Sequence, residues 1–441
     1  MLESSTVALI VIGVMLVLYA TELIPLATTS ILSCLALAVF GVIPFADALR
    51  GFGNDIVFLI VGMVIVGDAL FETGVADLIA RKIISVVGTN EKPFIWVLIL
   101  IITPISAFLN NTATVAMMLP IAASAIAASD GKLTKKDTYM TIGMVSVVGG
   151  GLTLVGSTPQ LIAQGLLQEG GHETMGFFEL SYTGLPILVL LIVYVMTIGF
   201  KMKKKVFDFP EVVDQSSGQV SGQASPAENE KNLSESERRR DGRIRTARMY
   251  ISVLVLVFCV AGFITGLWTL GTVAMAGAVI CVATGCISQS TVFNKMNWTT
   301  VVIMGCSFGI AAGLEQSGAG GLVARSMIGL LGDAVSPWLL CATLALAAVI
   351  FTNFMSSTAT AALLVPIAAL VAQELGYDVK SLVMSVAIAT NIGYATPIST
   401  PPITMTLAAG YRFKDYVKYG GLFNVLAYAL IVLLFPLVLN I

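Results

Sequence analysis

The chain has 441 residues, of which 57% are hydrophobic and only 11% are charged. About a quarter of the residues in an ordinary soluble domain are charged, so this composition excludes a soluble globular protein. The single histidine, His172, also excludes His-based nucleophile triads and His-rich metal sites. The six cysteines lie in apolar segments without CxxC spacing, so we expect them to be free thiols.

Apolar runs of 18 or more residues recur along the chain, and a helix of that length spans the hydrocarbon core of a bilayer, which is about 30 Å thick. The first run, Val7 to Ala20, follows no basic residue and contains no cleavage site, so we expect a retained helix. The first half is predicted to contain helices near 5–21, 25–46 and 55–80, a broken apolar stretch over 93–128, and helices near 139–167 and 182–200. The second half repeats this order, with helices near 249–267, 269–288 and 299–315, a broken stretch over 336–373, and helices near 381–410 and 418–440.

Between the halves, 1–200 and 249–441, lies the segment 201–248, which is too polar to bury a core and is predicted to be a flexible linker. It holds eleven of the 24 Lys and Arg residues, so the positive-inside rule places it in the cytoplasm. If the broken stretches are re-entrant hairpins, each half crosses the membrane five times, and two successive odd halves are inverted relative to each other. Ten of the 13 remaining basic residues then lie in inside loops. Both termini would lie outside the inner cell membrane.

Three pairs of matching segments support an internal duplication. ALFETGVADLIAR at 69–81 matches GLEQSGAGGLVAR at 313–325, and NNTATVAMMLPIA at 110–122 matches SSTATAALLVPIA at 356–368. VGSTPQLI at 155–162 also matches PISTPPIT at 397–404. Because the three pairs occur in the same order, the sequence predicts an all-α polytopic membrane protein. It would be built from two inverted repeats, each with five transmembrane helices, one re-entrant hairpin and one discontinuous helix.

Four polar breaks interrupt apolar runs, two in each half: Asn110 to Thr112, Gly156 to Pro159, Ser356 to Thr358 and Ser399 to Pro402. Non-helical backbone at membrane depth is tolerated only inside the protein or beside a wet cavity. Asn, Ser and Thr suit helix N-caps, and proline suits the first turn. We therefore expect four half-helix N-termini to meet and to bind an anion through N–H groups and helix dipoles, since no Lys or Arg lies beside the breaks.

Two simpler interpretations remain open. Ser, Thr and other small residues also allow membrane helices to pack closely without binding anything. The acids Asp68, Glu72 and Asp77 lie in an apolar segment, where an ionisable residue is usually functional. They also crowd the end of a predicted helix near Arg81, where they could cap the helix or reach water.

At the four breaks the sequence resembles the divalent anion:sodium symporter family, and the similarity extends to TELIPLATTSIL at Thr21 and GYRFKDYVKYG at Gly410. The resemblance implies a homodimer in membrane lipid, in which a transport domain slides past a scaffold domain like an elevator. It also implies a small anionic substrate held by eight residues: Asn111, Thr112, Ser157, Thr158, Ser357, Thr358, Thr400 and Pro401.

The same resemblance implies two sodium sites. The first would consist of Ser106, Asn110, Asn111 and the carbonyl of Gly156, and the second of Thr352, the carbonyl of Met355, Ser357 and Ser399. Two features depart from the family. The tip of the second hairpin, Ser356-Ser357-Thr358, lacks the central asparagine. Gln160 and Ile403 also stand where the family has an asparagine after the prolines.

We therefore predict a sodium-coupled secondary transporter of a dicarboxylate such as succinate or malate, or of a similar divalent anion. The sequence leaves open a sodium-independent anion exchanger, and a sodium/proton antiporter that uses Asp68 or Glu72. An enzyme is not expected, because no nucleophile and base pair is visible. Sodium is the expected coupling ion, with no organic cofactor and no nucleic-acid partner.

Overall fold

A computed structural model describes residues 3–75, 90–127, 129, 132–209, 235–322, 325–326 and 336–439. This part of the chain is helical and contains no β-strand. Eight of its helices are long and apolar enough to cross a membrane, or nine if one bent pair counts as a single span. The prediction of an all-α, multi-pass membrane protein is therefore confirmed.

The helices of the first half follow the predicted order. They are α1 (Ser4–Thr21), α2 (Leu26–Val39), α3 (Phe45–Leu49) with the 3-10 turn η1 (Arg50–Gly53), α4 (Asp55–Glu72), α6 (Glu91–Phe108), α7 (Asn111–Ala127), α8 (Lys135–Gly150), α9 (Thr158–Glu169), α10 (Ser181–Tyr194), the π-helical turn η2 (Val195–Gly199) and α11 (Phe200–Val206).

The second half has a similar order of elements. They are α13 (Glu235–Thr265), α14 (Leu270–Ala283), α15 (Gln289–Lys295), α16 (Trp298–Gln316), α18 (Pro337–Phe354), α19 (Ser357–Leu375), α20 (Val379–Ala389), α21 (Pro401–Met405) with η4 (Thr406–Ala409), and α22 (Phe413–Asp415), which continues through the π-helical turn η5 (Tyr416–Gly420) into α23 (Gly421–Val438).

Each half thus ends with a helix pair, a broken helix and a long final helix. The matched glycines Gly74 and Gly318 also adopt the same conformation, with φ of +84° and +70°, two residues after α4 and α16 end. This is a left-handed conformation that favours glycine. The inversion of the two repeats remains a prediction.

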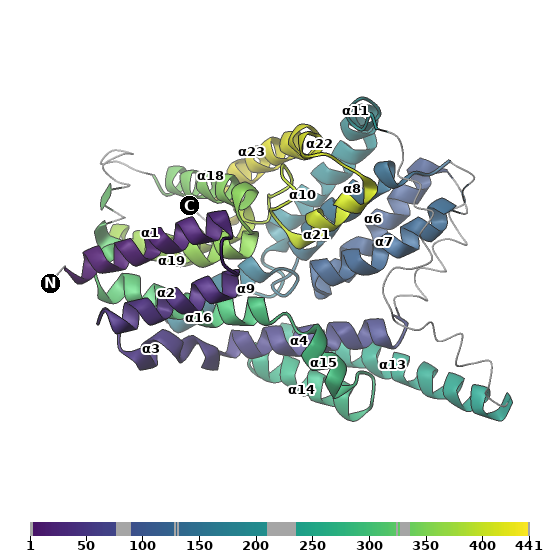
Figure 1. Ribbon diagram of the computed structural model, residues 1–441, viewed down its shortest axis with the longest axis horizontal. Helices are drawn as coiled ribbons and strands as arrows, with labels where there is room; N and C mark the ends of the chain where they lie inside the picture. The colour runs from purple at the N-terminus through teal and green to yellow at the C-terminus, as the bar shows by residue number, and fades with distance from the viewer. Residues whose placement is uncertain are drawn as a thin grey trace.

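The helices form two layers, which are drawn one below the other at the right of Figure 1 and overlap at its left, where α19 is drawn between α1 and α2. The first layer contains α1 to α4 and α13 to α16, in which α4 packs on α14 and α16 packs on α2. A Cβ atom at Gly62 of α4 would lie 2.5 Å from the carbonyl carbon of Ala274 in α14, so glycine allows this close approach. The second layer contains α6 to α11 and α18 to α23, and its helices α9 and α19 contact α16 of the first layer.

The prediction of a flexible linker over 201–248 is wrong at the two ends of this segment, which are helical. Residues up to Val206 continue the final helix of the first half, and Glu235 begins α13. Lys203 is only 4% exposed and pairs with Glu91 and, at 3.4 Å, with Asp137. Ion pairing therefore anchors the basic start of the segment against the second layer. The other end is rich in Glu and Arg, which are good helix formers.

The predicted acids of the first half are only partly described. Glu72 lies at the end of α4, and its carboxylate is 2.5 Å from the amine of Lys295 in α15. Both helices belong to the first layer, so this ion pair lies within that layer. Asp77 and Arg81 lie outside the described residues.

Candidate functional site

Two of the four polar breaks are the tips between paired helices. Helix α6 ends at Phe108 and α7 begins at Asn111, and the side chain of Asn110 accepts a 2.8 Å hydrogen bond from the amide of Thr112. Ser356 caps α19 in the same way, with its hydroxyl accepting a 3.2 Å hydrogen bond from the amide of Ala359. Both tips therefore use the predicted N-cap chemistry.

The other two breaks separate α8 from α9 and α20 from α21. Here neither Ser157 nor Thr400 caps the helix that follows. The Ser157 hydroxyl donates instead to Oδ1 of Asn391 at 2.6 Å. The Thr400 side chain is 5% exposed, and its hydroxyl has no hydrogen-bond partner within the part of the chain that the structure describes. A buried, unpaired hydroxyl is costly, so Thr400 has an unused capacity to bind a polar group.

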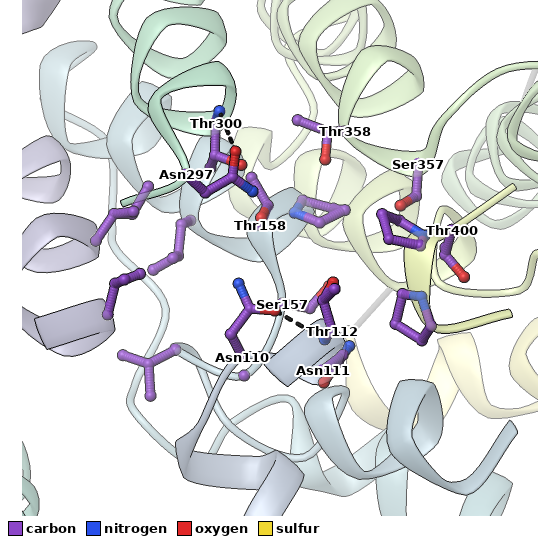
Figure 2. A pocket seen from close by; sticks show the side chains of 18 of the residues that line it. Asn110, Asn111, Thr112, Ser157, Thr158, Asn297, Thr300, Ser357, Thr358 and Thr400 are labelled. Carbon is purple, nitrogen blue, oxygen red and sulfur yellow. Dashed lines mark hydrogen bonds between the residues drawn. The ribbon is translucent and has the colours of Figure 1, made fainter. Parts of the chain in front are cut away.

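All four breaks meet at one cavity, which encloses about 890 Å³ including the space open to solvent. Figure 2 shows side chains from both tips and both broken helices around it. The cavity brings together all eight predicted substrate residues, namely Asn111, Thr112, Ser157, Thr158, Ser357, Thr358, Thr400 and Pro401. None of the described residues that line it is Asp, Glu, Lys or Arg.

The first layer supplies the remaining wall of the cavity. Apolar side chains come from α4 (Leu59, Ile60, Met63 and Val64), and polar ones come from Asn297 and Thr300 at the start of α16. Asn297 accepts a 3.2 Å hydrogen bond from the Thr300 amide through Oδ1, which leaves its Nδ2 as a donor beside the cavity. Sequence reasoning missed Asn297, Thr300 and Asn391. Asn297 precedes an apolar run and signals only a helix N-cap.

The residues expected to form the first sodium site are close together. The Ser106 hydroxyl donates to the carbonyl oxygen of Ser146 at 2.7 Å. In the orientation that satisfies its neighbours, the side-chain amide of Asn111 directs Nδ2 to Ser106 Oγ at 2.6 Å and to the carbonyl oxygens of Ser146 and Gly156 at 3.1 Å. Asn110 lines the cavity, but its side chain is engaged in the helix cap. The structure thus adds Ser146, which sequence reasoning did not select.

The residues expected to form the second sodium site also lie near one another, since a Cβ atom at Gly393 would be 3.2 Å from Ser399 Oγ and 3.3 Å from Thr352 Oγ1. The Ser357 amide donates to the carbonyl of Ser399 at 3.0 Å, and Thr352 donates to the carbonyl of Thr390 at 3.0 Å. The Ser399 hydroxyl donates to the carbonyl of Gly393. The remaining expected ligand is Met355, whose side chain is 2% exposed. Of these four expected ligands, only Ser357 lines the cavity.

Asn353, which lies just before the second tip, has a structural role. Asn353 is one residue beyond Thr352, and its Oδ1 accepts hydrogen bonds of 3.0 Å from the Ala395 amide and from Nδ2 of Asn424. Its own Nδ2 donates to the carbonyl of Val349 at 2.7 Å. Because these bonds hold the chain between α20 and α21, Asn353 is not available to replace the asparagine missing from the tip.

The two substituted positions after the prolines do not line the cavity. Gln160 is 1% exposed and lies beside a separate, smaller cavity with Asn391 and Tyr394, while Ile403 is fully buried. No group of three or more His, Cys, Asp or Glu that could hold a metal occurs among the described residues. Any cation at this site would therefore bind to hydroxyl, amide and carbonyl oxygens.

Sequence comparisons indicate that the chain is related to transporters. Residues 16–381 match the model of the citrate transporter family. An uncharacterised transporter of Haemophilus influenzae is 27% identical over 435 residues, which cover 94% of this chain and 88% of the relative. The sodium-dependent dicarboxylate transporter SdcS of Staphylococcus saprophyticus is 25% identical, with coverage of 94% and 82%, and that of Staphylococcus aureus is 23% identical, with coverage of 96% and 84%.

Solved structures show a similar fold. The YdaH transporter of Alcanivorax borkumensis superposes with a TM-score of 0.52 at 14% identity, and covers 90% of this chain and 88% of its own. The MtrF efflux pump of Neisseria gonorrhoeae gives a TM-score of 0.54 at 13% identity, with coverage of 98% and 95%. At these identities the likeness concerns the fold alone.

Proposed function

Because this chain belongs to the citrate transporter family, we propose that it carries small dicarboxylates or similar divalent anions across the cell membrane together with sodium. Family membership makes it a multi-pass secondary transporter of anions and not an enzyme. It also agrees with the predicted relationship to the divalent anion:sodium symporters. Which anion is carried, the role of sodium and the mechanism of movement are the parts that we propose.

One observation carries the proposal for the anion, namely the convergence of four polar breaks on an uncharged cavity. Its wall offers hydroxyl, amide and backbone N–H donors, including the hydroxyl of Thr400, which has no partner among the residues that the structure describes. Two carboxylates of one substrate could each bind to one pair of breaks. The site would balance their charge by dipoles and bound cations, since no Lys or Arg among the described residues lines the cavity.

Sodium coupling is supported by two observations. Two relatives are named sodium-dependent dicarboxylate transporters. In addition, the Ser106 hydroxyl and the carbonyl oxygens of Ser146 and Gly156 lie together around the side-chain amide of Asn111, and oxygens are the ligands that hard cations prefer. We propose this cluster as the first sodium site, and the surroundings of Ser357 and Ser399 as a second site.

The two layers suggest how transport occurs. We propose that the second layer carries the anion as an elevator domain while the first layer acts as the scaffold of a homodimer. We also propose that residues 201–248 are cytoplasmic and both termini are outside. In support of that sidedness, Figure 1 shows both termini left of centre, whereas the start of α13 is at the right.

The alternatives have less support. A sodium/proton antiporter would need a titratable acid at the site, but no described residue lining the cavity is acidic, and Glu72 is paired with Lys295. A sodium-independent exchanger would not need the oxygen cluster around Asn111. The deciding experiment is uptake of radiolabelled succinate, malate, citrate and sulfate into proteoliposomes, with sodium or choline at constant ionic strength. Uptake that needs sodium and acidifies neither side supports the proposal. Uptake that is as fast in choline as in sodium overturns the coupling.

A further inference from the structure

The wall of the anion cavity combines residues from both layers. The four polar breaks belong to the second layer. Among the described residues, the first layer supplies apolar side chains of α4 and only two polar residues, Asn297 and Thr300 at the start of α16. An apolar surface would suffice to close the cavity on this side. The two polar residues therefore need an explanation of their own.

The side chain of Asn297 is oriented by the helix that it caps. Its Oδ1 accepts a 3.2 Å hydrogen bond from the amide of Thr300, which is drawn as a dashed line in Figure 2. Because this bond fixes which atom faces α16, Nδ2 is turned away from the helix, and it has no acceptor among the residues that the structure describes. Asn297 is exposed at the wall of the cavity, so its side-chain N–H groups are accessible to a bound molecule.

Thr300 adds a donor that is almost completely buried. Its side chain is 9% exposed and lines the cavity, and its hydroxyl forms no hydrogen bond with another described residue. A hydroxyl in this position has lost hydrogen bonds to bulk water, which is unfavourable unless a ligand or a bound water replaces them. Thr400 has a similarly unpaired hydroxyl in the part of the wall that the second layer supplies. Each layer therefore presents a donor to the cavity.

We propose that Asn297 and Thr300 form a third subsite, which binds an oxygen-bearing substituent of the transported anion; this inference rests on the dicarboxylate transport proposed above. The four breaks account for two carboxylates, one for each pair of breaks, so the donors of the first layer remain for a further group. Both donors are uncharged. They suit the hydroxyl of a hydroxy-dicarboxylate such as malate, or the third carboxylate of a tricarboxylate such as citrate.

The subsite connects the anion to the layer that does not travel. If the second layer moves as an elevator domain, the contacts to Asn297 and Thr300 have to break before the anion can cross, whereas the contacts to the four breaks persist. An interaction that is made in the bound state and lost during the movement strengthens binding without speeding the movement. Anions that carry the additional group should therefore bind more tightly than succinate and be carried no faster.

The test compares the binding of succinate, malate and citrate to the purified full-length protein at saturating sodium. Thr300→Val keeps the shape of the side chain and removes its hydroxyl, and Asn297→Ser keeps a good N-cap residue and removes Nδ2. The matched controls are Thr272→Val, at the corresponding position of α14, and Asn54→Ser, at a residue that caps α4 through a 2.9 Å hydrogen bond from the Ile56 amide. Neither control residue lines the cavity.

We expect each cavity variant to weaken the binding of malate, citrate or both at least about fivefold, and to change succinate binding less than about twofold, as should the controls for all three anions. Loss of malate affinity alone identifies a hydroxyl subsite, and loss of citrate affinity alone identifies a carboxylate subsite. Equal losses for all three anions, losses matched by the controls, or unchanged affinities for malate and citrate would overturn the subsite. Wild-type protein that binds none of the three anions would instead overturn the proposed function.

Uptake into proteoliposomes gives a readout that a merely structural role would not produce. The two cavity variants should raise the KM for the affected anion without lowering its maximal rate, because the lost contact belongs to the layer that stays in place. A maximal rate that falls while the KM is unchanged would show that Asn297 and Thr300 support the fold and do not bind the anion.

Discussion

The hydroxyl of Ser157 donates a 2.6 Å hydrogen bond to Oδ1 of Asn391, which joins the broken helices of the two halves beside the cavity. The Asn391 amide is oriented by a second hydrogen bond, from its Nδ2 to the carbonyl of Ala387 at 3.1 Å. The single proton of the Ser157 hydroxyl is therefore already used. Ser157 is better placed to position the start of α9 than to donate from its side chain to an anion.

This arrangement predicts that Ser157→Ala and Asn391→Ala weaken anion binding to a similar extent. Each variant removes the same hydrogen bond, which is worth about 1 kcal/mol, or roughly a fivefold change in affinity. The double variant should lose little more than either single one. Succinate affinities of the four proteins measure this double-mutant cycle. Additive losses would show that Ser157 and Asn391 act on the anion separately.

A second prediction concerns the ion pair between the layers. The Arg50 guanidinium in η1 lies 2.8 Å from the carboxylate of Glu169 at the end of α9. Arg50 is 65% exposed, so the pair contributes less than about 1 kcal/mol and can separate easily. If the second layer moves past the first, cysteines at 50 and 169 joined by a short, reducible cross-linker should stop uptake reversibly.

The control for this experiment is a cysteine pair within the first layer. Asp47 of α3 and Gln316 of α16 are joined by a 3.2 Å hydrogen bond, and cross-linking them should leave uptake unchanged. The six native cysteines are buried, which limits side reactions. Full uptake with residues 50 and 169 cross-linked would show that the layers do not separate there.

The third prediction concerns Thr358, which lines the cavity from the second tip. Thr358→Val keeps the shape of the side chain and removes its hydroxyl. A hydrogen bond to a charged group contributes about 1.5–3 kcal/mol, so the KM for the anion should rise roughly tenfold to a hundredfold. Thr343→Val in α18, where the hydroxyl donates to the Leu339 carbonyl at 2.8 Å, should have little effect. An unchanged KM in Thr358→Val would exclude this hydroxyl from the anion site.

The fourth prediction follows from the difference between the two tips. Because Ser357 replaces the asparagine expected from the family, its hydroxyl cannot serve a cation and the anion with separate groups. We expect sodium activation with low apparent affinity or weak cooperativity, and stronger dependence in Ser357→Asn. Uptake measured against sodium concentration at constant ionic strength gives both quantities. A sodium curve that stays the same in Ser357→Asn would remove this position from the coupling mechanism.

The last prediction concerns sidedness. Eleven basic residues lie in 201–248, and we expect this segment to be cytoplasmic. A cysteine at Ser225, which lies outside the described residues, should resist a membrane-impermeant thiol reagent in intact cells and react after permeabilisation. The native cysteines add little background because all six are buried. Rapid labelling of intact cells would reverse the proposed orientation.

Much of this protein could be predicted from local features of the sequence. Hydrophobic runs predicted the order and approximate bounds of the long helices, because the bilayer thickness sets their length. Polar breaks such as Asn110 to Thr112 marked the site, because polar backbone inside a membrane needs partners. The predicted bounds of the linker were too wide at both ends. At its start, the polarity of the segment did not reveal the buried pairing of Lys203 with Glu91 and Asp137.

Other parts of the site depend on contacts between distant residues. No local pattern links Ser157 to Asn391, which is 234 residues further along the chain, or brings Asn297 of the first layer to the cavity. Ser146 looked like an ordinary small residue of an apolar helix, and only folding brings its carbonyl within 3.1 Å of the Asn111 side-chain amide. The sequence alone determined which segments form long apolar helices and where they break, since those depend on transfer from water to lipid. Only the tertiary structure decided which side chains meet, because that depends on how the two layers pack.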